Sequence, residues 1–293
     1  MVLDFFASSS ERACVWVTGA GGLIGHQLAR AAAPFSARGR VHGLTHAELD
    51  LTDFAVVRGV FHREQPRCIV HCAALSRSPV CQNQPALARK INVEATALLA
   101  ELAADIPFIF FSSDLVFDGR QGNYDESAPV NPLSVYAETK VEAEKIVMSN
   151  PRHTVVRTSL NGGLSPAGNR AFNEELRLAW QQGQTVRLFT DEFRCPIPAL
   201  VTARAIWELA AVNQPGLYHL AGSQRLSRWE IGQLLAARWP DLSACMEAGS
   251  LREYCGAPRP ADCSLNCAKI QRRLSFPLPG LADWLAANPE EPF

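Results

Sequence analysis

Short apolar runs alternate with helical patterns over residues 1–160, and this alternation constrains the fold more than any other feature of the sequence. Strands are expected at residues 13–19, 40–46, 67–74, 107–113 and 153–159, and helices at residues 22–33, 53–64, 85–105 and 134–149. Asp53 is the expected N-cap of the second helix. Strands separated by helices of this length pair in parallel, and the helices cover both faces of the sheet. The sequence therefore predicts an α/β fold of the Rossmann type, with a doubly wound parallel sheet.

The pattern changes after residue 160, where loops rich in glycine and proline become frequent and strands become rare. Helices are expected at residues 168–182, 199–213 and 227–238. We therefore expect an NAD(P)-binding domain at residues 1–160 and a smaller, mostly helical substrate-binding lobe at residues 161–293. Some strands and helices of the lobe are expected to return to the first domain. The final segment, NPEEPF, is expected to fray.

Composition and charge exclude several classes of protein. The 293 residues are 47% hydrophobic and carry a formal net charge of −1, so nothing indicates binding to nucleic acid or to a membrane surface. No apolar run approaches the ~20 residues needed to span a bilayer, and the N-terminus lacks the basic region of a signal peptide. Nine scattered cysteines without a C-x-x-C pair indicate buried, reduced thiols and no metal site. The expected location is the cytoplasm.

A glycine-rich turn, VTGAGGLIG at residues 17–25, joins the first expected strand to the first helix. Gly19, Gly22 and Gly25 permit a tight turn, close approach of the backbone to a pyrophosphate, and packing of the helix on the strand. The helix N-terminus adds free N–H groups and a favourable dipole. A glycine triplet alone is a weak signal, but its place between a strand and a helix indicates a dinucleotide site.

The residues after the second strand bear on the choice of dinucleotide. An acid about twenty residues beyond the turn would bind the 2′-hydroxyl of NAD. The sequence has Thr45 and His46 there and no carboxylate to repel a 2′-phosphate, while the basic residues Arg38, Arg40 and His46 would favour one. We therefore expect NADP(H) to be preferred over NAD(H).

Polar residues with catalytic potential follow the fourth strand. Ser112, Ser113 and Asp114 come where an apolar strand ends, and ligands bind outside the carboxyl ends of parallel strands. Tyr136 and Lys140 are four residues apart on a helix and so share one face. An ammonium group near a phenol favours the phenolate and lowers the pKa of the phenol toward neutrality.

The order of these motifs resembles the extended short-chain dehydrogenase/reductases, and within them the dTDP-4-dehydrorhamnose reductase family. The resemblance rests on TGAGGLIG (18–25), ELDLTD (48–53), HCAA (71–74), SSDLVFDG (112–119), YAETK (136–140), GLYHLAG (216–222) and APRP (257–260). It implies reduction of a keto group on a nucleotide-linked deoxysugar by NAD(P)H. Relatives of this fold also suggest a homodimer.

The resemblance assigns roles to individual residues. Ser113 would donate a hydrogen bond to the reacting carbonyl, Tyr136 would protonate its oxygen, and Lys140 would lower the pKa of Tyr136 and bind the ribose. The implied cofactor-binding residues are Gly19, Gly22, Leu23, Ile24, Gly25, Thr45, His46, Asp50, Leu51, Ala73, Ala74, Tyr136 and Lys140. The implied substrate-binding residues are Ser76, Ser113, Leu115, Asn161, Arg194 and Arg259.

Two positions depart from the family pattern. Leu115 replaces a tyrosine of the family and Leu160 replaces a frequent tryptophan, and both family aromatics face the sugar. Loss of a hydroxyl and two aromatic walls changes what the pocket can recognise. Three alternatives therefore stay open: an NADP-binding regulatory subunit similar to that of methionine adenosyltransferase, a reductase of a non-sugar metabolite, and an epimerase or dehydratase.

Overall fold

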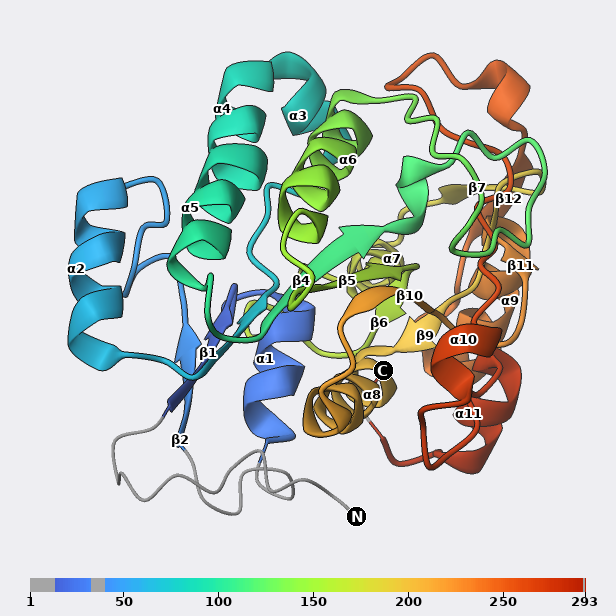
Figure 1. The fold of residues 1–293 in the computed structure, drawn as a ribbon. Coiled ribbons are helices and arrows are strands. Elements are labelled where there is room, and N and C mark those ends of the chain that lie inside the picture. Colours follow the sequence, from blue (N-terminus) through green and yellow to red (C-terminus); the bar gives the residue numbers. More distant parts are fainter. Residues whose placement is uncertain (1–13, 33–39, 292) are drawn as a thin grey trace.

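The computed structural model describes residues 14–32, 40–291 and 293, and within them six parallel strands form the main sheet (Figure 1). The strand order is β10-β5-β4-β3-β1-β2. The strands are β1 (Cys14–Thr18), β2 (Arg40–Leu44), β3 (Cys68–His71), β4 (Phe108–Ser113), β5 (Thr154–Thr158) and β10 (Gly216–Leu220). Each neighbouring pair is parallel, so all six carboxyl ends lie at one edge of the sheet.

Helices cover both faces of this sheet, as the sequence predicts. The helices α1 (Leu23–Arg30) and α8 (Ala199–Val212) lie on one face, while α2 (Phe54–Glu64), α5 (Ala95–Leu102) and α6 (Val135–Met148) lie on the other (Figure 1). Consecutive residues of β1 alternate between the two cores: Val15 and Val17 pack under α1 and α8, and Trp16 packs under α2. A strand buried on both sides must be apolar at every position, which explains the continuous runs in the sequence.

The N-cap predicted for the second helix can be checked directly. The Asp53 carboxylate accepts a hydrogen bond from the backbone N–H of Val56, 3.1 Å away, so the predicted N-cap of α2 is confirmed.

The helix expected at residues 85–105 is present as a continuous helical segment, residues 85–102, that contains a π-helical turn. The helices α3 (Ser78–Asn83) and α4 (Pro85–Arg89) precede a π-helical turn, Lys90–Glu94, which leads into α5. Pro85 lacks a backbone N–H and therefore begins a new helix rather than continuing α3. The π-helical turn places the side chain of Asn92 against the segment after β3, where it hydrogen-bonds to the backbone of Leu75.

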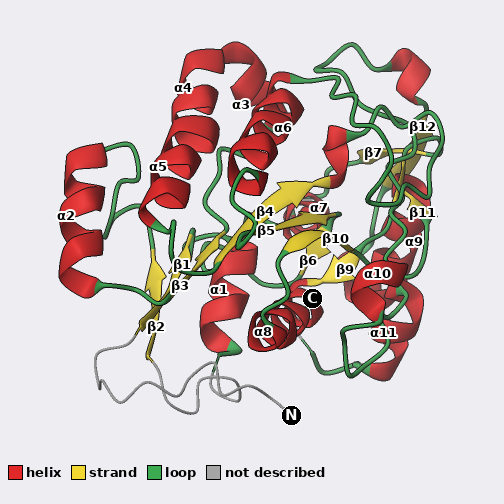
Figure 2. Cartoon of the chain, in the orientation of Figure 1, coloured by secondary structure: helices red, strands yellow, loops and turns green. Residues whose placement is uncertain are grey.

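The C-terminal half contains more strands than the sequence indicates (Figure 2). Three two-stranded sheets pair β6 (Asn161–Gly162) with β9 (Ile197–Pro198), β7 (Val186–Phe189) with β12 (Met246–Gly249), and β8 (Phe193–Arg194) with β11 (Leu226–Ser227). The helices of this half, besides α8, are α7 (Phe172–Gln181), α9 (Arg228–Arg238), α10 (Ala268–Gln271) and α11 (Leu281–Ala287). The division of the chain at residue 160 stays a prediction, since β10 and α8 complete the main sheet and its cover.

The C-terminal residue is packed against the protein, although the final segment is expected to fray. Phe293 is buried, and its ring packs against Trp284 with 5.3 Å between ring centroids. The same ring occupies the space in which a side chain at position 162 would lie, where the chain has Gly162. The prediction of fraying is therefore wrong for Phe293.

Several expectations concern single residues or short segments. All nine cysteines are free, and Cys245 and Cys255 are exposed rather than buried. The N-terminal segment and Arg38 lie outside the described residues. No described helix is long and apolar enough to cross a membrane. The described residues also contain no group of three or more histidine, cysteine, aspartate or glutamate side chains that could bind a metal ion.

Gly25 allows α1 to pack on the turn after β1. A Cβ atom there would contact the carbonyl oxygen of Gly19 and would lie 2.9 Å from the backbone N of Ala20, and backbone atoms cannot rotate away. We expect Gly25→Ala to lower the free energy of unfolding by about 1–3 kcal/mol, as overpacking does. Thermal or urea denaturation measures the change.

Gly21→Ala is the matched control, because a Cβ atom at Gly21 would meet only the Thr45 side chain, 3.9 Å away. Its stability should equal that of the wild type. Equal stability of the Gly25→Ala and Gly21→Ala proteins would contradict the importance of this close contact.

Candidate active site

The turn after β1 and the segment after β3 meet at the carboxyl edge of the sheet. Gly19 has φ +72°, a conformation that glycine adopts without strain. A Cβ atom on Gly19 would lie 2.7 Å from the backbone N of Ala73. Glycine at this position therefore permits the turn and brings it against Ala73.

The N-terminus of α1 has the chemistry of an anion site. Gly22 is the N-cap and offers no side chain to the first N–H groups of the helix. Leu23 packs with Ala171 and Ala199, and the side chain of Ile24 packs against the core under α8, so only their backbone faces the edge. Free N–H groups at a helix N-terminus suit a phosphate, and Gly19, Gly22, Leu23, Ile24 and Gly25 thus fit the cofactor-binding role that the sequence predicts.

A second observation indicates that a polar ligand belongs here. The hydroxyl of Ser112 is buried and has no hydrogen-bond partner among the described residues. A buried hydroxyl without a partner is unfavourable by about 1–3 kcal/mol. Ser112 directly precedes Ser113, the last residue of β4, so a ligand hydroxyl that reaches this strand end would satisfy it. The residues present therefore fit a dinucleotide with its ribose groups.

The end of β2 differs from the expectation that no carboxylate lies there. The Glu48 carboxylate accepts hydrogen bonds from the backbone N–H and the hydroxyl of Thr45, at 2.8 and 2.7 Å. These two hydrogen bonds lower the pKa of Glu48, so the group is charged at neutral pH. Arg40 begins β2 at the opposite edge of the sheet, so about 13 Å of strand separates it from Leu44, where β2 ends. Of the basic residues cited for a 2′-phosphate, only His46 is described at this end, and its side chain is exposed.

The predicted adenine contacts lie close to the same strand end. Asp50 accepts hydrogen bonds from the backbone N–H and the hydroxyl of Thr52, and its carboxylate is 3.8 Å from His46. Leu51 packs against the core under α2. Across the edge, Ala73 and Ala74 follow β3, and Ser76 is exposed just before α3.

Ser113 ends β4 and is held from two sides. Its hydroxyl accepts a hydrogen bond from the backbone N–H of Leu115 and donates one to the Asp114 carboxylate, both at 3.2 Å. Burial raises the pKa of Asp114, while Arg194 and the hydroxyl of Ser159 act in the opposite direction. The single proton of Ser113 is thus directed at Asp114, and a bound carbonyl oxygen would compete for it.

Tyr136 lies in the first turn of α6, whose N-cap Ser134 accepts a hydrogen bond from the N–H of Ala137. Burial raises the pKa of Tyr136 above its ordinary value, and the nearby hydroxyl of Ser113 only partly opposes this. The charge on Asp114 raises the pKa further. The expected lowering of this pKa by Lys140 is not found in this structure, and burial keeps the phenol protonated.

Lys140 lies one turn further along α6 and points at the same strand. Its Nζ donates a hydrogen bond to the carbonyl oxygen of Phe111, at 2.8 Å, and lies 4.5 Å from the centre of the Phe110 ring. Burial lowers the pKa of Lys140 to about 8, against opposing effects of Cys72 and Glu144. Ser113 and Tyr136 therefore lie near each other at the end of β4, and Lys140 bonds to the same strand two residues before Ser113.

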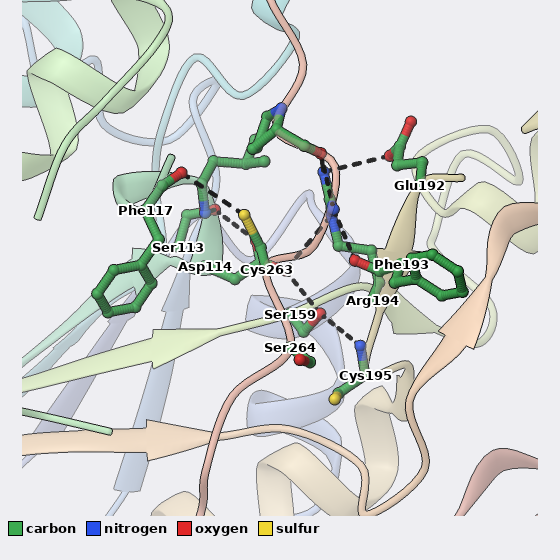
Figure 3. A network of polar contacts seen from close by, with 12 residues as sticks. Ser113, Asp114, Phe117, Ser159, Glu192, Phe193, Arg194, Cys195, Cys263 and Ser264 are labelled. Carbon is green, nitrogen blue, oxygen red and sulfur yellow. Dashed lines mark hydrogen bonds and ion pairs between the residues drawn. The ribbon is translucent and has the colours of Figure 1, made fainter. Parts of the chain in front are cut away.

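Behind Ser113 lies a buried ionic network that connects β4 to the C-terminal half (Figure 3). The Nε of Arg194 is 3.7 Å from the Asp114 carboxylate, and its Nη2 is 3.2 Å from Glu192. Glu192 also pairs with Arg228 at 3.3 Å and with Arg259 at 2.7 Å. Burial alone would raise the pKa of Glu192, but the charges of these arginines outweigh burial and lower it.

The predicted substrate-binding residues differ in how deeply they are buried and in whether their polar groups already have hydrogen-bond partners. Arg194 is buried, and it also donates to the backbone carbonyl of Pro260, so its guanidinium is already occupied. Arg259 is partly exposed. Leu115 packs near Tyr136. The Asn161 amide is satisfied by Thr158, Ser159 and Thr202.

Three residues of this site were not predicted from the sequence. Glu48 could have been found, because Thr45 and Glu48 have the spacing of a capping box. Ser112 belongs to a polar run in the sequence, but its lack of a hydrogen-bond partner depends on packing. Glu192 has no local signal, since its three arginine partners come from β8, α9 and the loop that contains Arg259.

The fold and the residues at its carboxyl edge define a Rossmann-type α/β protein. The chain belongs to the family described as the RmlD substrate-binding domain, whose model matches residues 13–288. The resemblance to dTDP-4-dehydrorhamnose reductases seen in the sequence is thereby confirmed.

Individual relatives carry two different names. Methionine adenosyltransferase 2 subunit beta from Xenopus laevis is 27% identical over 286 residues, covering 93% of this chain and 85% of that protein. A dTDP-4-dehydrorhamnose reductase from Sinorhizobium fredii is 30% identical over 251 residues, covering 80% and 84%. A solved structure, of a hypothetical dTDP-4-dehydrorhamnose reductase from Sulfolobus tokodaii, matches with a TM-score of 0.81 at 28% identity, covering 92% of this chain and 97% of that one.

The buried ammonium of Lys140 has a consequence for stability. Its pKa in the folded protein is about 8, below the ordinary 10.5, so between these values the unfolded chain binds more protons and stability rises with pH. Below pH 8 the full cost of burying the charge is present. We expect Lys140→Met to melt at a higher temperature than the wild type at pH 7, without added dinucleotide. The difference should shrink as the pH rises from 8 toward 10.5.

Lys145→Met on the same helix is the control, because Lys145 is exposed and its replacement should change the melting temperature little. A wild type more stable than Lys140→Met at pH 7 would show that the hydrogen bond to Phe111 outweighs the cost of burial.

Proposed function

We propose that this protein is an NAD(P)H-dependent reductase of a keto group, most similar in function to the dTDP-4-dehydrorhamnose reductases. The observation that carries the proposal is that Tyr136 lies near Ser113 at the end of β4 while Lys140 bonds to Phe111 of the same strand, on the same sheet edge as the glycine-rich turn. A hydroxyl, a phenol and an ammonium in this arrangement suit the reduction of a carbonyl group to an alcohol.

The same edge offers a place for each part of a dinucleotide. The N–H groups at the start of α1 would bind the pyrophosphate. The backbone at Ala73 and Ala74 would lie against a ribose, and Lys140 with the unpartnered hydroxyl of Ser112 would bind the other ribose. When bound, the dinucleotide supplies the hydride that the carbonyl carbon accepts.

The protein supplies the proton. Burial keeps Tyr136 protonated at neutral pH, so it can donate its proton to the carbonyl oxygen as negative charge develops there. Ser113 would donate a hydrogen bond to the same oxygen in place of its bond to Asp114. Lys140, which carries positive charge below pH 8, would stabilise the phenolate that Tyr136 leaves behind.

The proposed substrate is a nucleotide-linked deoxysugar with a keto group. Arg259 is partly exposed beside the buried Glu192 and is the better placed of the two predicted arginines to contact a phosphate. Leu115 and Leu160 replace aromatic residues of the family, so a keto metabolite other than dTDP-4-dehydrorhamnose fits the proposal as well. A homodimer and a cytoplasmic location stay predictions.

A second candidate function is a dinucleotide-binding regulatory subunit. It is favoured by the similarity to methionine adenosyltransferase 2 subunit beta over 93% of the chain. A protein that only binds a dinucleotide has no need of Ser113, Tyr136 and Lys140, and their presence together favours the reductase.

Activity against a panel of nucleotide-linked 4-keto sugars tests the proposal. Purified protein should oxidise NADPH or NADH with at least one of them, and Tyr136→Phe should lower kcat by about 10²–10⁴-fold because the proton donor is lost. Tyr218→Phe is the matched control. It also removes a buried phenol hydroxyl, one that bonds to the carbonyl of Gln214 away from the site, and it should keep its activity.

The outcomes separate the two candidates. Dinucleotide binding without turnover of any panel member, together with capture of a methionine adenosyltransferase catalytic subunit, would favour the regulatory function. Turnover that survives in Tyr136→Phe would exclude the proposed proton donor.

Glu48 changes the expectation about the dinucleotide. Its charge at the end of β2 opposes a 2′-phosphate, and Arg40 is too far away to favour one. We therefore propose that the protein accepts both NADH and NADPH. Glu48→Gln should raise the ratio of NADPH to NADH affinity by roughly threefold to fivefold, since it removes one exposed charge.

Glu94→Gln, an exposed carboxylate on the π-helical turn, is the control for that measurement and should leave the ratio unchanged. Titration of each protein with both dinucleotides by fluorescence gives the affinities. An unchanged ratio in Glu48→Gln would show that this carboxylate lies outside the site.

A further inference from the structure

A continuous chain of hydrogen bonds runs through the interior from the segment after β3 to the first turn of α6. The groups in order are Ala73 N–H, Thr18 Oγ1, His71, Thr96 Oγ1, the carbonyl and side chain of Asn92, Thr139 Oγ1 and the carbonyl of Tyr136. The four side chains before Thr139 are almost completely buried. The chain therefore connects the predicted dinucleotide contact at Ala73 to the helix that carries Tyr136.

The direction of each hydrogen bond around His71 follows from counting protons. The hydroxyl of Thr96 gives its only proton to the carbonyl of Asn92, 2.7 Å away, so it must accept from Nε2 of His71, 3.0 Å away. His71 is neutral, because burial, and secondly the charge of Lys140, lowers its pKa to about 3. Its Nδ1 then has no proton and accepts from the hydroxyl of Thr18 at 2.7 Å.

Thr18 connects His71 to Ala73 at the edge of the sheet. With its own proton given to His71, its oxygen accepts from the N–H of Ala73, 3.3 Å away. A single tautomer of His71 therefore satisfies every group from Ala73 to the carbonyl of Asn92. The ring itself is fixed by Phe108 and Phe110, each with its centroid 5.8 Å from that of His71.

Asn92 fixes the other end of the same segment. Its side chain accepts from the N–H of Leu75 at 2.8 Å and donates to the carbonyl of Leu75 at 3.1 Å. It also donates to the hydroxyl of Thr139 at 3.0 Å, and that hydroxyl donates to the carbonyl of Tyr136 at 2.7 Å. Ala74 is thus held between two anchored residues.

We propose that His71 is a positioning residue for the dinucleotide: it holds the backbone of Ala73–Leu75 in the conformation that binds the ribose and pyrophosphate. The role needs a rigid ring with one donor and one acceptor on opposite sides, and the aromatic stacking alone does not supply it. It rests on the dinucleotide binding in the proposed function and goes beyond it, since His71 touches neither cofactor nor substrate.

His71→Phe tests the role, because phenylalanine keeps the shape and the stacking and removes both hydrogen bonds. We expect the Kd for NADPH and for NADH to rise about tenfold, as the loss of one to two buried hydrogen bonds allows. His153→Phe is the matched control. His153 is also buried and packs against Phe108, with 5.4 Å between ring centroids, but it donates to the carbonyl of Ala103 at the opposite edge of the sheet. His153→Phe should lower the melting temperature without changing the Kd for either dinucleotide.

Thr18→Val is a second variant in case His71→Phe does not fold. It removes the link between His71 and Ala73 with almost no change in volume, and it should weaken dinucleotide binding to a similar extent. If either folded variant binds NADPH and NADH with the wild-type Kd, His71 is only a core residue and the proposed role is wrong. If the wild type binds neither dinucleotide, the proposed function itself fails and this role fails with it.

Discussion

The common direction of the six strands of the main sheet is the constraint on which the candidate site depends. Parallel strands all end at one edge, so groups from distant parts of the sequence, such as Gly19, Ala73 and Ser113, meet there without any special arrangement of loops. The helix that follows each strand begins near the same edge and brings its free N–H groups, or a side chain such as Tyr136, to the site. The position of the site is thus a property of the topology, and its chemistry is a property of a few residues.

The site contains several groups that are unfavourable to bury. Lys140, Asp114 and Tyr136 all have pKa values shifted toward their neutral forms, chiefly by burial. The protein compensates only in part, through the carbonyl of Phe111 and the guanidinium of Arg194. Such groups are tolerated because the rest of the sheet, with an apolar core on each face, is stable enough to hold them.

The sequence predicts the parts of this structure that depend on neighbours in the chain. The strands of the first half, its helices other than α3, the glycine turn and the Asp53 cap all follow from local patterns, and the structure confirms them. Contacts between distant segments were not predictable in the same way. The burial of Arg194 depends on how the C-terminal half folds over β4, and the place of Arg40 depends on strand direction. The two-residue strands have too few residues for any period to be visible.

The place of β10 in the main sheet has a consequence for how the chain folds. This strand is the edge neighbour of β5, and α8, just before it, lies against α1, where Trp207 donates to the carbonyl of Leu28 at 3.0 Å. Until residue 220 has left the ribosome, one face of the sheet lacks half of its cover and β5 presents an unpaired edge. Such edges promote association with other chains. About sixty residues separate β5 from β10. While these residues are being synthesised, the uncovered face of the sheet and the unpaired edge of β5 are exposed, and chaperone binding is expected to matter most at this stage.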